Sequence, residues 1–225
     1  MYKSNTLTVY GNPFIGIYAK TNDKIMLVGE SVADRFFRYK DLMKVEIIKT
    51  TLCDSELIGI YCALNSNGII VSKLTSEDEI KKLKEIGSEY GLVIEVLQSK
   101  FTAVGNNIVV NDYGAIVNMN LESEDIKKIK DTFNVEVDKF TIGGYQTVGA
   151  ALLATNKGFI AHPFAKEEEL EKIKSIMKTD GGIGTANGGV PFPSISMLAN
   201  SYNFISGDKT TGYELHRINE CLGFI

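Results

Sequence analysis

The sequence predicts an α+β fold in which a ββαβ unit occurs five times and the five units close into a ring. Three observations predict this fold. Turn signals rich in Asn, Asp and Gly recur at nearly equal intervals, short runs of β-branched residues flank them, and an amphipathic helical segment follows. Such a period is typical of repeat architectures. No polar capping segment is apparent at either end, which favours a closed ring over an open solenoid.

The turn signals set the period of the repeat. Their last residues are Lys24, Gly68, Gly114, Gly158 and Asn203, which gives intervals of 44, 46, 44 and 45 residues. The 22 residues after Asn203 and the 24 residues that end at Lys24 together supply one further interval, so the two chain ends are predicted to complete one unit. We therefore expect one domain, 1–225, with approximate units 14–57, 58–104, 105–148, 149–193, and 194–225 joined by 1–13.

Short strands are predicted on both sides of each turn signal, and in the first three units a further strand follows the helix, because the apolar runs there are rich in Ile and Val. In chain order they are 14–28 (two strands and a turn) and 44–50; 58–64, 69–71 and 92–97; 107–110, 115–117 and 135–140; 150–154 and 158–161; 194–199 and 203–206. The N-terminal strand 6–10 is expected to complete the last unit and close the ring.

One helix is predicted in each unit: a degenerate, aromatic-rich segment near 32–43, one that begins after residue 75 or 76, and then 123–133, 166–177 and 211–222. Thr75 or Ser76, and also Ser123, have the side chains that cap helix N-termini. Thr211 with Glu214 forms the pattern of a capping box. Apolar residues spaced three or four apart predict the buried helix faces: Ile80, Leu83 and Ile86, then Ile126, Ile129 and Phe133.

Composition excludes several classes of protein. The chain is 44% hydrophobic and 23% charged, which is typical of a globular protein, and its net charge of −4 disfavours a protein that mainly grips nucleic acid. There is no signal-peptide pattern and no apolar run long enough to span a membrane. The three cysteines lack metal-site spacing and predict free, buried thiols in a reducing compartment, so we expect a cytoplasmic protein.

Candidate chemical sites are few. Cys221 with His162 or His216 raises the possibility of an activated thiol, but Cys221 lies on the apolar face of the last helix and is interpreted as a core residue. Two isolated histidines do not predict a metal site. The acidic runs 77–79 and 167–169 fall in first helical turns, where the helix dipole favours them, and are interpreted as solvated.

The glycine run 181–189 is a further candidate. No Lys-Ser or Lys-Thr follows it, and Pro191 and Pro193 break any helix that would begin there, so a phosphate-binding loop is disfavoured. A flexible connection between units is the preferred interpretation.

A glycine recurs near the start of each first strand, at Gly16, Gly59, Gly105 and Gly149, with Ser194 at the fifth position. In a ring these positions share one rim. Two interpretations remain open: the turns between units need positive φ, or small residues leave the backbone open to close approach by a partner.

Several segments, in this order, resemble the translation initiation factor 6 family of archaea and eukaryotes. They are 15–22, 103–106, 111–113, 135–137, 156–163, 184–188 and 210–215, and the resemblance spans essentially the full length. It implies the pentein fold, or α/β-propeller, with five units around a pseudo-fivefold axis. Because the chain lacks the polar C-terminal extension of eukaryotic members, an archaeal-type member is expected.

The resemblance also implies a function. Family members bind the large ribosomal subunit on the face that meets the small subunit, prevent premature association, and take part in late large-subunit maturation. The implied partner is chiefly a ribosomal protein near the sarcin–ricin loop, with minor rRNA contact, no cofactor, no metal and no membrane, and the protein is expected to be a monomer. An acidic chain suits a basic ribosomal protein.

The expected ribosome-binding rim consists of Gly16, Ile17, Gly59, Ile60, Gly105, Asn106, Asn107, Val135, Gly149 and Ala151. Two alternatives stay open. Pentein folds also include amidinotransferases and amidinohydrolases, for which Cys221 would be the nucleophile. The ring could instead be an interaction module for another partner.

Overall fold

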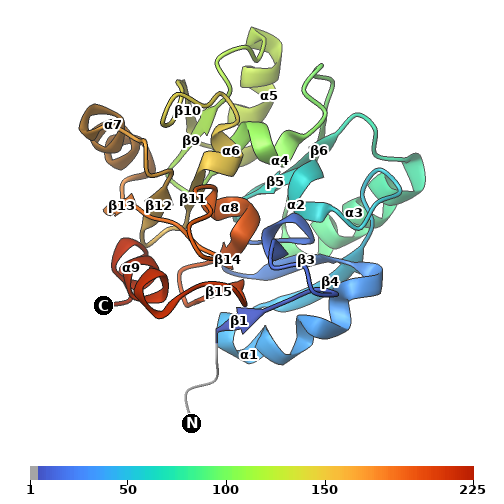
Figure 1. Ribbon diagram of the computed structural model, residues 1–225. Coiled ribbons are helices and arrows are strands. Elements are labelled where there is room, and N and C mark those ends of the chain that lie inside the picture. Colours follow the sequence, from blue (N-terminus) through green and yellow to red (C-terminus); the bar gives the residue numbers. More distant parts are fainter. Residues whose placement is uncertain (1–4) are drawn as a thin grey trace.

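Five three-stranded sheets surround a central axis in the computed structural model, which describes residues 5–225 (Figure 1). Each sheet has an inner strand, a middle strand antiparallel to it, and an outer strand parallel to the middle one. The inner strands are β2 (Ala19–Thr21), β5 (Cys62–Leu64), β8 (Ile108–Val110), β11 (Leu152–Ala154) and β14 (Met197–Ala199). The middle strands are β3 (Ile25–Gly29), β6 (Gly68–Ser72), β9 (Gly114–Val117), β12 (Phe159–Ala161) and β15 (Phe204–Gly207).

The outer strands close the ring. In chain order they are β4 (Glu46–Thr50), β7 (Val93–Leu97), β10 (Glu136–Lys139), β13 (Gly181–Ile183) and β1 (Thr6–Leu7). The last of these comes from the N-terminus and pairs parallel with β15, Thr6 opposite Ser206 and Leu7 opposite Gly207. The predicted ring closure by the N-terminal strand is confirmed, although the strand has two residues because Val9 bridges to Asn12 instead. We number units 1 to 5 by the sheets that contain β3, β6, β9, β12 and β15.

Helices cover the outside of the ring (Figure 1). They are α3 (Glu77–Tyr90), α5 (Ser123–Phe133), α7 (Glu167–Met177) and α9 (Gly212–Cys221), with η2 (Glu30–Arg35), η3 (Phe37–Tyr39) and α1 (Lys40–Met43) in unit 1. Ser76, one of the two predicted candidates, caps α3, and Thr211 caps α9 through the predicted capping box. The cap of α3 is also a capping box, with Glu79. The predicted cap Ser123 is wrong, because the N-cap of α5 is Glu122 and Ser123 is its first helical residue. The degenerate segment of unit 1 is broken into three short pieces.

The first strands predicted at 58–64, 107–110, 150–154 and 194–199 are wrong in their opening residues. Those residues belong to a helical turn, and only the last three residues of each range are a strand. The turns are η1 (Ile15–Ile17), α2 (Ile58–Tyr61), α4 (Val104–Asn107), α6 (Val148–Ala151) and α8 (Pro193–Ser196). An apolar run of this length fits a buried turn and a buried strand equally well, so its periodicity could not separate them.

The predicted flexible connection at 181–189 is also wrong in its first residues, because Gly181–Ile183 is strand β13 and pairs with β12. A Cβ on Gly181 would lie 2.3 Å from the carbonyl oxygen of Phe159. Glycine is therefore required there for two backbones to approach closely, not for flexibility.

The apolar core lies between neighbouring units and not inside any one of them. Successive residues of a middle strand face opposite sides, so Met26 and Val28 pack in a cluster shared with unit 5, whereas Ile25 and Leu27 pack against unit 2. The other units repeat this arrangement, which gives five buried clusters. Middle strands are buried on both faces, and this explains their unbroken apolar runs. A unit needs both neighbours to bury its apolar residues.

Among the residues that the structure describes, no helix has the length and apolar character required to cross a membrane.

Candidate functional site

One end of the ring is formed by the five helical turns η1, α2, α4, α6 and α8, and we call it the helical-turn end. Here the recurring glycines bring neighbouring backbones into contact. A Cβ on Gly59 would lie 1.9 Å from the Gly16 oxygen, and one on Gly105 would lie 2.0 Å from the Gly59 oxygen. Gly149 approaches the Gly105 oxygen and Gly16 approaches that of Ser194 in the same way, at 2.2 and 2.0 Å. A side chain at any of these glycines would push two units apart.

These contacts decide between the two interpretations of the recurring glycines. None of the four has a positive φ, so the turn interpretation is wrong. Close backbone approach is correct, but the approaching backbone belongs to the neighbouring unit. The glycines are buried, and the surface of this end comes from the residues that follow them.

The residue after each glycine or serine occupies the same place in its turn. Ile17, Ile60, Asn106 and Ile195 are partly exposed there, and Ala150 is nearly buried. All five side chains are uncharged and four are apolar. The helical-turn end therefore presents a neutral patch on a closely packed base.

Besides the buried glycines, three further residues of the expected rim do not belong to this surface. Ala151 is fully buried, and the residue of its unit that corresponds to Ile60 is Ala150. The Asn107 side chain is buried and donates to the carbonyl oxygen of Ala103 at 2.8 Å. Val135 is buried and lies at the opposite end of the ring, since the next residue, Glu136, pairs with Gly114 beside the turn of unit 3.

The opposite end, which we call the asparagine-turn end, contains the five turn signals. Here asparagine side chains join neighbouring units. Asn22 donates to the Asn65 carbonyl oxygen at 2.9 Å, Asn65 to that of Asn111 at 3.2 Å, and Asn111 to that of Thr155 at 3.0 Å. Asn200 donates to the Asn22 oxygen at 3.3 Å across the point of ring closure. The sequence signal of a turn is thus also the residue that joins two units.

Charged and aromatic groups surround these asparagines. Asn156 donates to Asp23 at 3.0 Å and to Asp112 at 2.6 Å, although the three lie in different units. Tyr113 and Tyr202 are 46% and 45% exposed. In contrast to the helical-turn end, this end is polar and charged.

Buried glutamates hold the loops between units in place, a role that the sequence reading missed. Glu214 accepts hydrogen bonds from the backbone N–H groups of Gly188 and Gly189 at 3.1 and 2.8 Å. Thr185 and Thr211 donate to the same carboxylate. Burial by itself would raise the pKa of Glu214, but these hydrogen bonds outweigh it and lower the pKa to about 2.

Glu79 and Glu169 have the corresponding role in units 2 and 4. Glu79 accepts from the N–H groups of Cys53 and Asp54 at 3.0 and 3.1 Å, and Glu169 from that of Gly143 at 3.2 Å. The interpretation of the acidic runs as solvated is therefore wrong for Glu79, which is 5% exposed. The capping-box spacing indicated the helix start but gave no sign of the distant loop.

Cys221 and His162 have separate surroundings. The Cys221 thiol is buried and contacts the Ile183 carbonyl oxygen at 3.8 Å, and burial raises its pKa to about 11. A nucleophilic cysteine needs the opposite shift. His162 packs among Tyr145, Phe164 and Phe192, and burial lowers its pKa. The core interpretation of Cys221 agrees with its position at the end of α9, where it contacts β13.

Within residues 5–225, no cluster of three or more His, Cys, Asp or Glu side chains is arranged to hold a metal ion.

Known proteins resemble this chain along nearly its whole length. Residues 4–221 match the family model of the eIF-6 family. Translation initiation factor 6 of Thermococcus onnurineus is 36% identical over 95% of both chains, and that of Pyrococcus furiosus is 41% identical over 95% of this chain and 96% of its own. The protein of the same name from Methanocaldococcus jannaschii is 36% identical over 96% of both. Among solved structures, C. jejuni agmatine deiminase aligns with a TM-score of 0.37 and 16% identity, over 55% of this chain and 49% of its own.

Proposed function

Because the chain belongs to the eIF-6 family, whose members are translation initiation factors, we propose that it binds the large ribosomal subunit at its intersubunit face and sterically prevents premature association with the small subunit. The proposal includes a part in late large-subunit biogenesis. It also includes a main contact with a ribosomal protein near the sarcin–ricin loop, and minor rRNA contact. The protein would act in the cytoplasm, as a monomer and without catalysis.

The helical-turn end is the proposed contact surface, and one observation carries this choice. The partly exposed side chains of its helical turns are uncharged and mostly apolar, namely Ile17, Ile60, Asn106 and Ile195, whereas the other end carries aspartates and lysines. The centre of a stable protein interface is depleted in charged residues. The expected rim is accordingly narrowed to the residue that follows each buried glycine or serine.

Rigidity supports the proposed mechanism. The helical turns rest on backbone contacts between units and have little freedom to yield. A closed ring bound at the intersubunit face would block the small subunit by its volume alone. The net charge of −4 would favour approach to a basic ribosomal protein, so binding should weaken as salt is raised.

Sedimentation tests the proposal directly. Purified large subunits are incubated with the protein at low salt, and small subunits are then added. We expect the protein to sediment with the large subunit and the fraction of joined subunits to fall. If the protein stays at the top of the gradient, the proposal is wrong.

A pair of arginine substitutions tests the assigned surface. Asn106→Arg places charge and bulk on the helical-turn end and should weaken sedimentation with the large subunit about tenfold or more. Tyr113→Arg makes a comparable change on the asparagine-turn end, at a side chain 46% exposed, and should leave binding unchanged. Equal loss in both variants, or loss in Tyr113→Arg alone, would contradict the assignment. Thermal unfolding of both variants checks that the fold is intact.

A further inference from the structure

The five inner strands enclose a channel along the axis of the ring. One residue of each inner strand lies at the same level along the axis of the ring. These residues correspond because each pairs with the equivalent residue of its own middle strand. Lys20 pairs with Leu27, for example, and Ala63 pairs with Ile70. The residues at this level are Lys20, Ala63, Val109, Leu153 and Leu198. Four of the five are apolar, and Lys20 is the exception.

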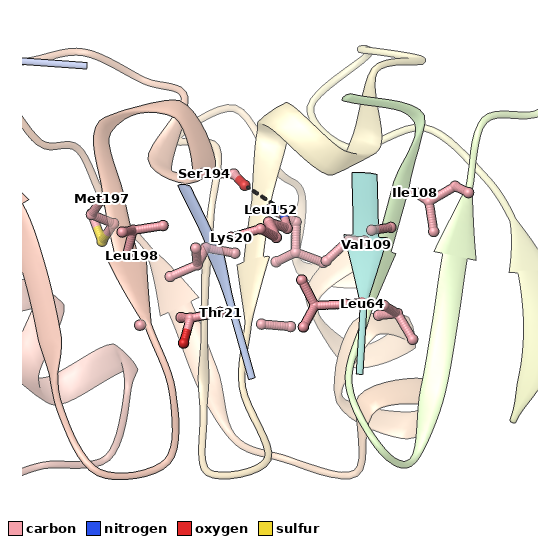
Figure 2. A pocket seen from close by; sticks show the side chains of 14 residues that line it. Lys20, Thr21, Leu64, Ile108, Val109, Leu152, Ser194, Met197 and Leu198 are labelled. Atoms are coloured by element: carbon pink, nitrogen blue, oxygen red, sulfur yellow. Dashed lines mark hydrogen bonds between the residues drawn. The ribbon is translucent and has the colours of Figure 1, made fainter. Parts of the chain in front are cut away.

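The Lys20 side chain is half-buried among the inner strands, and its amine lacks a countercharge. This side chain lies against the channel. The amine donates to the hydroxyl of Ser194 at 3.5 Å, and a dashed line marks this hydrogen bond in Figure 2. In the part of the chain from residue 5 onward, no carboxylate lies within ion-pair distance of this amine. The neighbouring Cys62 thiol supplies no charge, since burial raises its pKa to about 12.

Ser194 is itself an exception. The other four units have glycine at its position, so the two polar departures from the repeat contact each other. The serine hydroxyl accepts from the amine and keeps its own proton to donate. The hydroxyl of Thr21, by contrast, already lies 3.0 Å from the carbonyl oxygens of Asn22 and Ile25. The remaining N–H groups of the Lys20 amine and the proton of the Ser194 hydroxyl are therefore available to an acceptor placed between them.

The cavity beside Lys20 and Ser194 has room for a small ion. The cavity beside Lys20 offers about 30 Å³ for the centre of a water-sized sphere, enough for about two waters or one monatomic anion. A second cavity, lined by Asn22, Asn65, Asn111 and Asn200, shares Thr21 and Leu64 with the first and continues toward the asparagine-turn end. The two cavities therefore follow one another along the axis of the ring.

We propose that the axial channel binds a small inorganic anion of the size of chloride or bromide between the Lys20 amine and the Ser194 hydroxyl. An unpaired ammonium in an apolar enclosure is costly, and an anion supplies the missing charge and accepts the free N–H groups. Without the anion, burial lowers the pKa of Lys20, and the anion would favour its charged form. The channel walls exclude organic anions by their size.

Bromide provides the direct test. Crystals of the full chain are grown or soaked in sodium bromide, and anomalous scattering is measured at the bromine edge. We expect an anomalous peak within about 4 Å of both the Lys20 Nζ and the Ser194 Oγ, given ordinary ion contacts. Density without an anomalous signal at that place would identify water and overturn the proposal.

Thermal unfolding provides the second test in solution. The chloride concentration is raised from 10 to 500 mM while sodium gluconate keeps the ionic strength constant, for the unaltered protein, Lys20→Met and the surface control Lys24→Met. If the dissociation constant lies about tenfold below the highest concentration, the Tm should rise by about 4 °C in the unaltered protein and in Lys24→Met. Lys20→Met should not respond. An equal response of all three proteins, or of none, would contradict the proposal, and if Lys20→Met does not fold, the bromide measurement decides.

Discussion

The contact between units 4 and 5 is built differently from the four other contacts of the ring. At the helical-turn end, four contacts use a glycine whose backbone lies against a neighbouring carbonyl oxygen. The fifth position is Ser194, whose Cβ prevents the same approach to unit 4. The other four contacts are therefore closed by backbone, and this one lacks the glycine that permits such an approach.

The same contact is exceptional at the asparagine-turn end. Four units donate an asparagine amide to the next unit, but unit 4 has Thr155, whose hydroxyl lies 3.0 Å from the carbonyl oxygen of Gly158 in its own turn. The inner strands show the same difference, because β11 and β14 are less closely packed than any other neighbouring pair of inner strands. Both ends of the 4–5 contact thus lack the link that the others share.

This difference shows how a pseudosymmetric ring stays closed although one of its five contacts is built differently. Each unit must cover its apolar faces with two neighbours, so the ring stays closed even where one contact lacks its standard links. Ser194 belongs to this looser contact, whereas its hydrogen bond with Lys20 reaches unit 1. We expect opening to begin at this contact, since local stability follows local packing.

The largest effect should come from breaking a standard contact. In Gly59→Ala the new Cβ would lie 1.9 Å from the Gly16 oxygen. The nearest atoms are all backbone, so no flexible side chain can move aside to make room for it. We expect a loss of at least about 4 kcal/mol in the free energy of unfolding, or failure to fold. Urea denaturation measures it.

Gly212→Ala is the matched control for that substitution. Gly212 begins α9 and no atom lies within 4 Å of an added Cβ, so stability should stay within about 1 kcal/mol. Similar losses in the two variants would mean that the glycine contacts do not hold the units together.

Removing an amide link should cost less. In Asn111→Ala, the carbonyl oxygens of Thr155 and Met177 lose their donor, and the N–H groups of Tyr113 and Gly114 lose their acceptor. We expect a loss of about 3 kcal/mol in denaturation experiments. The exposed Asn120→Ala serves as control and should change stability by less than about 0.5 kcal/mol. Equal effects would refute the role of the buried amide.

Acid should loosen the loop that joins units 4 and 5. The Glu214 pKa is lowered to about 2 in the folded chain from an ordinary 4.5, so the folded state favours the charged carboxylate. Its stabilisation is present above pH 4.5 and is lost as the pH falls toward 2. Glu214→Gln should lose about 2 kcal/mol at pH 7 and show a weaker pH dependence between 4.5 and 2. Parallel pH curves for the two proteins would contradict this role.

The smallest effect should come from restoring the missing link. Thr155→Asn gives unit 4 the side chain of the other four units, in position to donate to the carbonyl oxygen of Asn200. We expect a gain of about 1 kcal/mol and slower hydrogen exchange across the contact of units 4 and 5. A loss of stability would show that the wider contact is incompatible with the standard link.

Much of this architecture was predicted from the sequence because it repeats. The turn signals gave the period, and the ends of the chain gave the closure, which β1 and β15 confirm. Helix starts at Ser76 and Thr211 were predicted from local hydrogen-bonding patterns that need no distant partner. Features that depend only on interactions between residues close in sequence were therefore predicted.

The candidate site was predicted less completely, for reasons of distance. Asn106 and Ile60 lie together at one end of the ring, as expected, but Val135 was assigned to a rim that it does not share. The strand direction that separates the two ends cannot be inferred from the local sequence pattern. Nor could the sequence show that Glu214 holds a loop about 25 residues away in the chain. Both depend on which segments fold against each other.

The sequence by itself determined a ring of five units, their turns and their capped helices, since each follows from periodic burial and local hydrogen bonding. Only the tertiary structure decided what the recurring small residues do. The glycines serve the contact of one backbone with the next, and the asparagines of the turns reach into neighbouring units. These roles arise where separate units meet, and the difference between the 4–5 contact and the others exists only after the ring has closed.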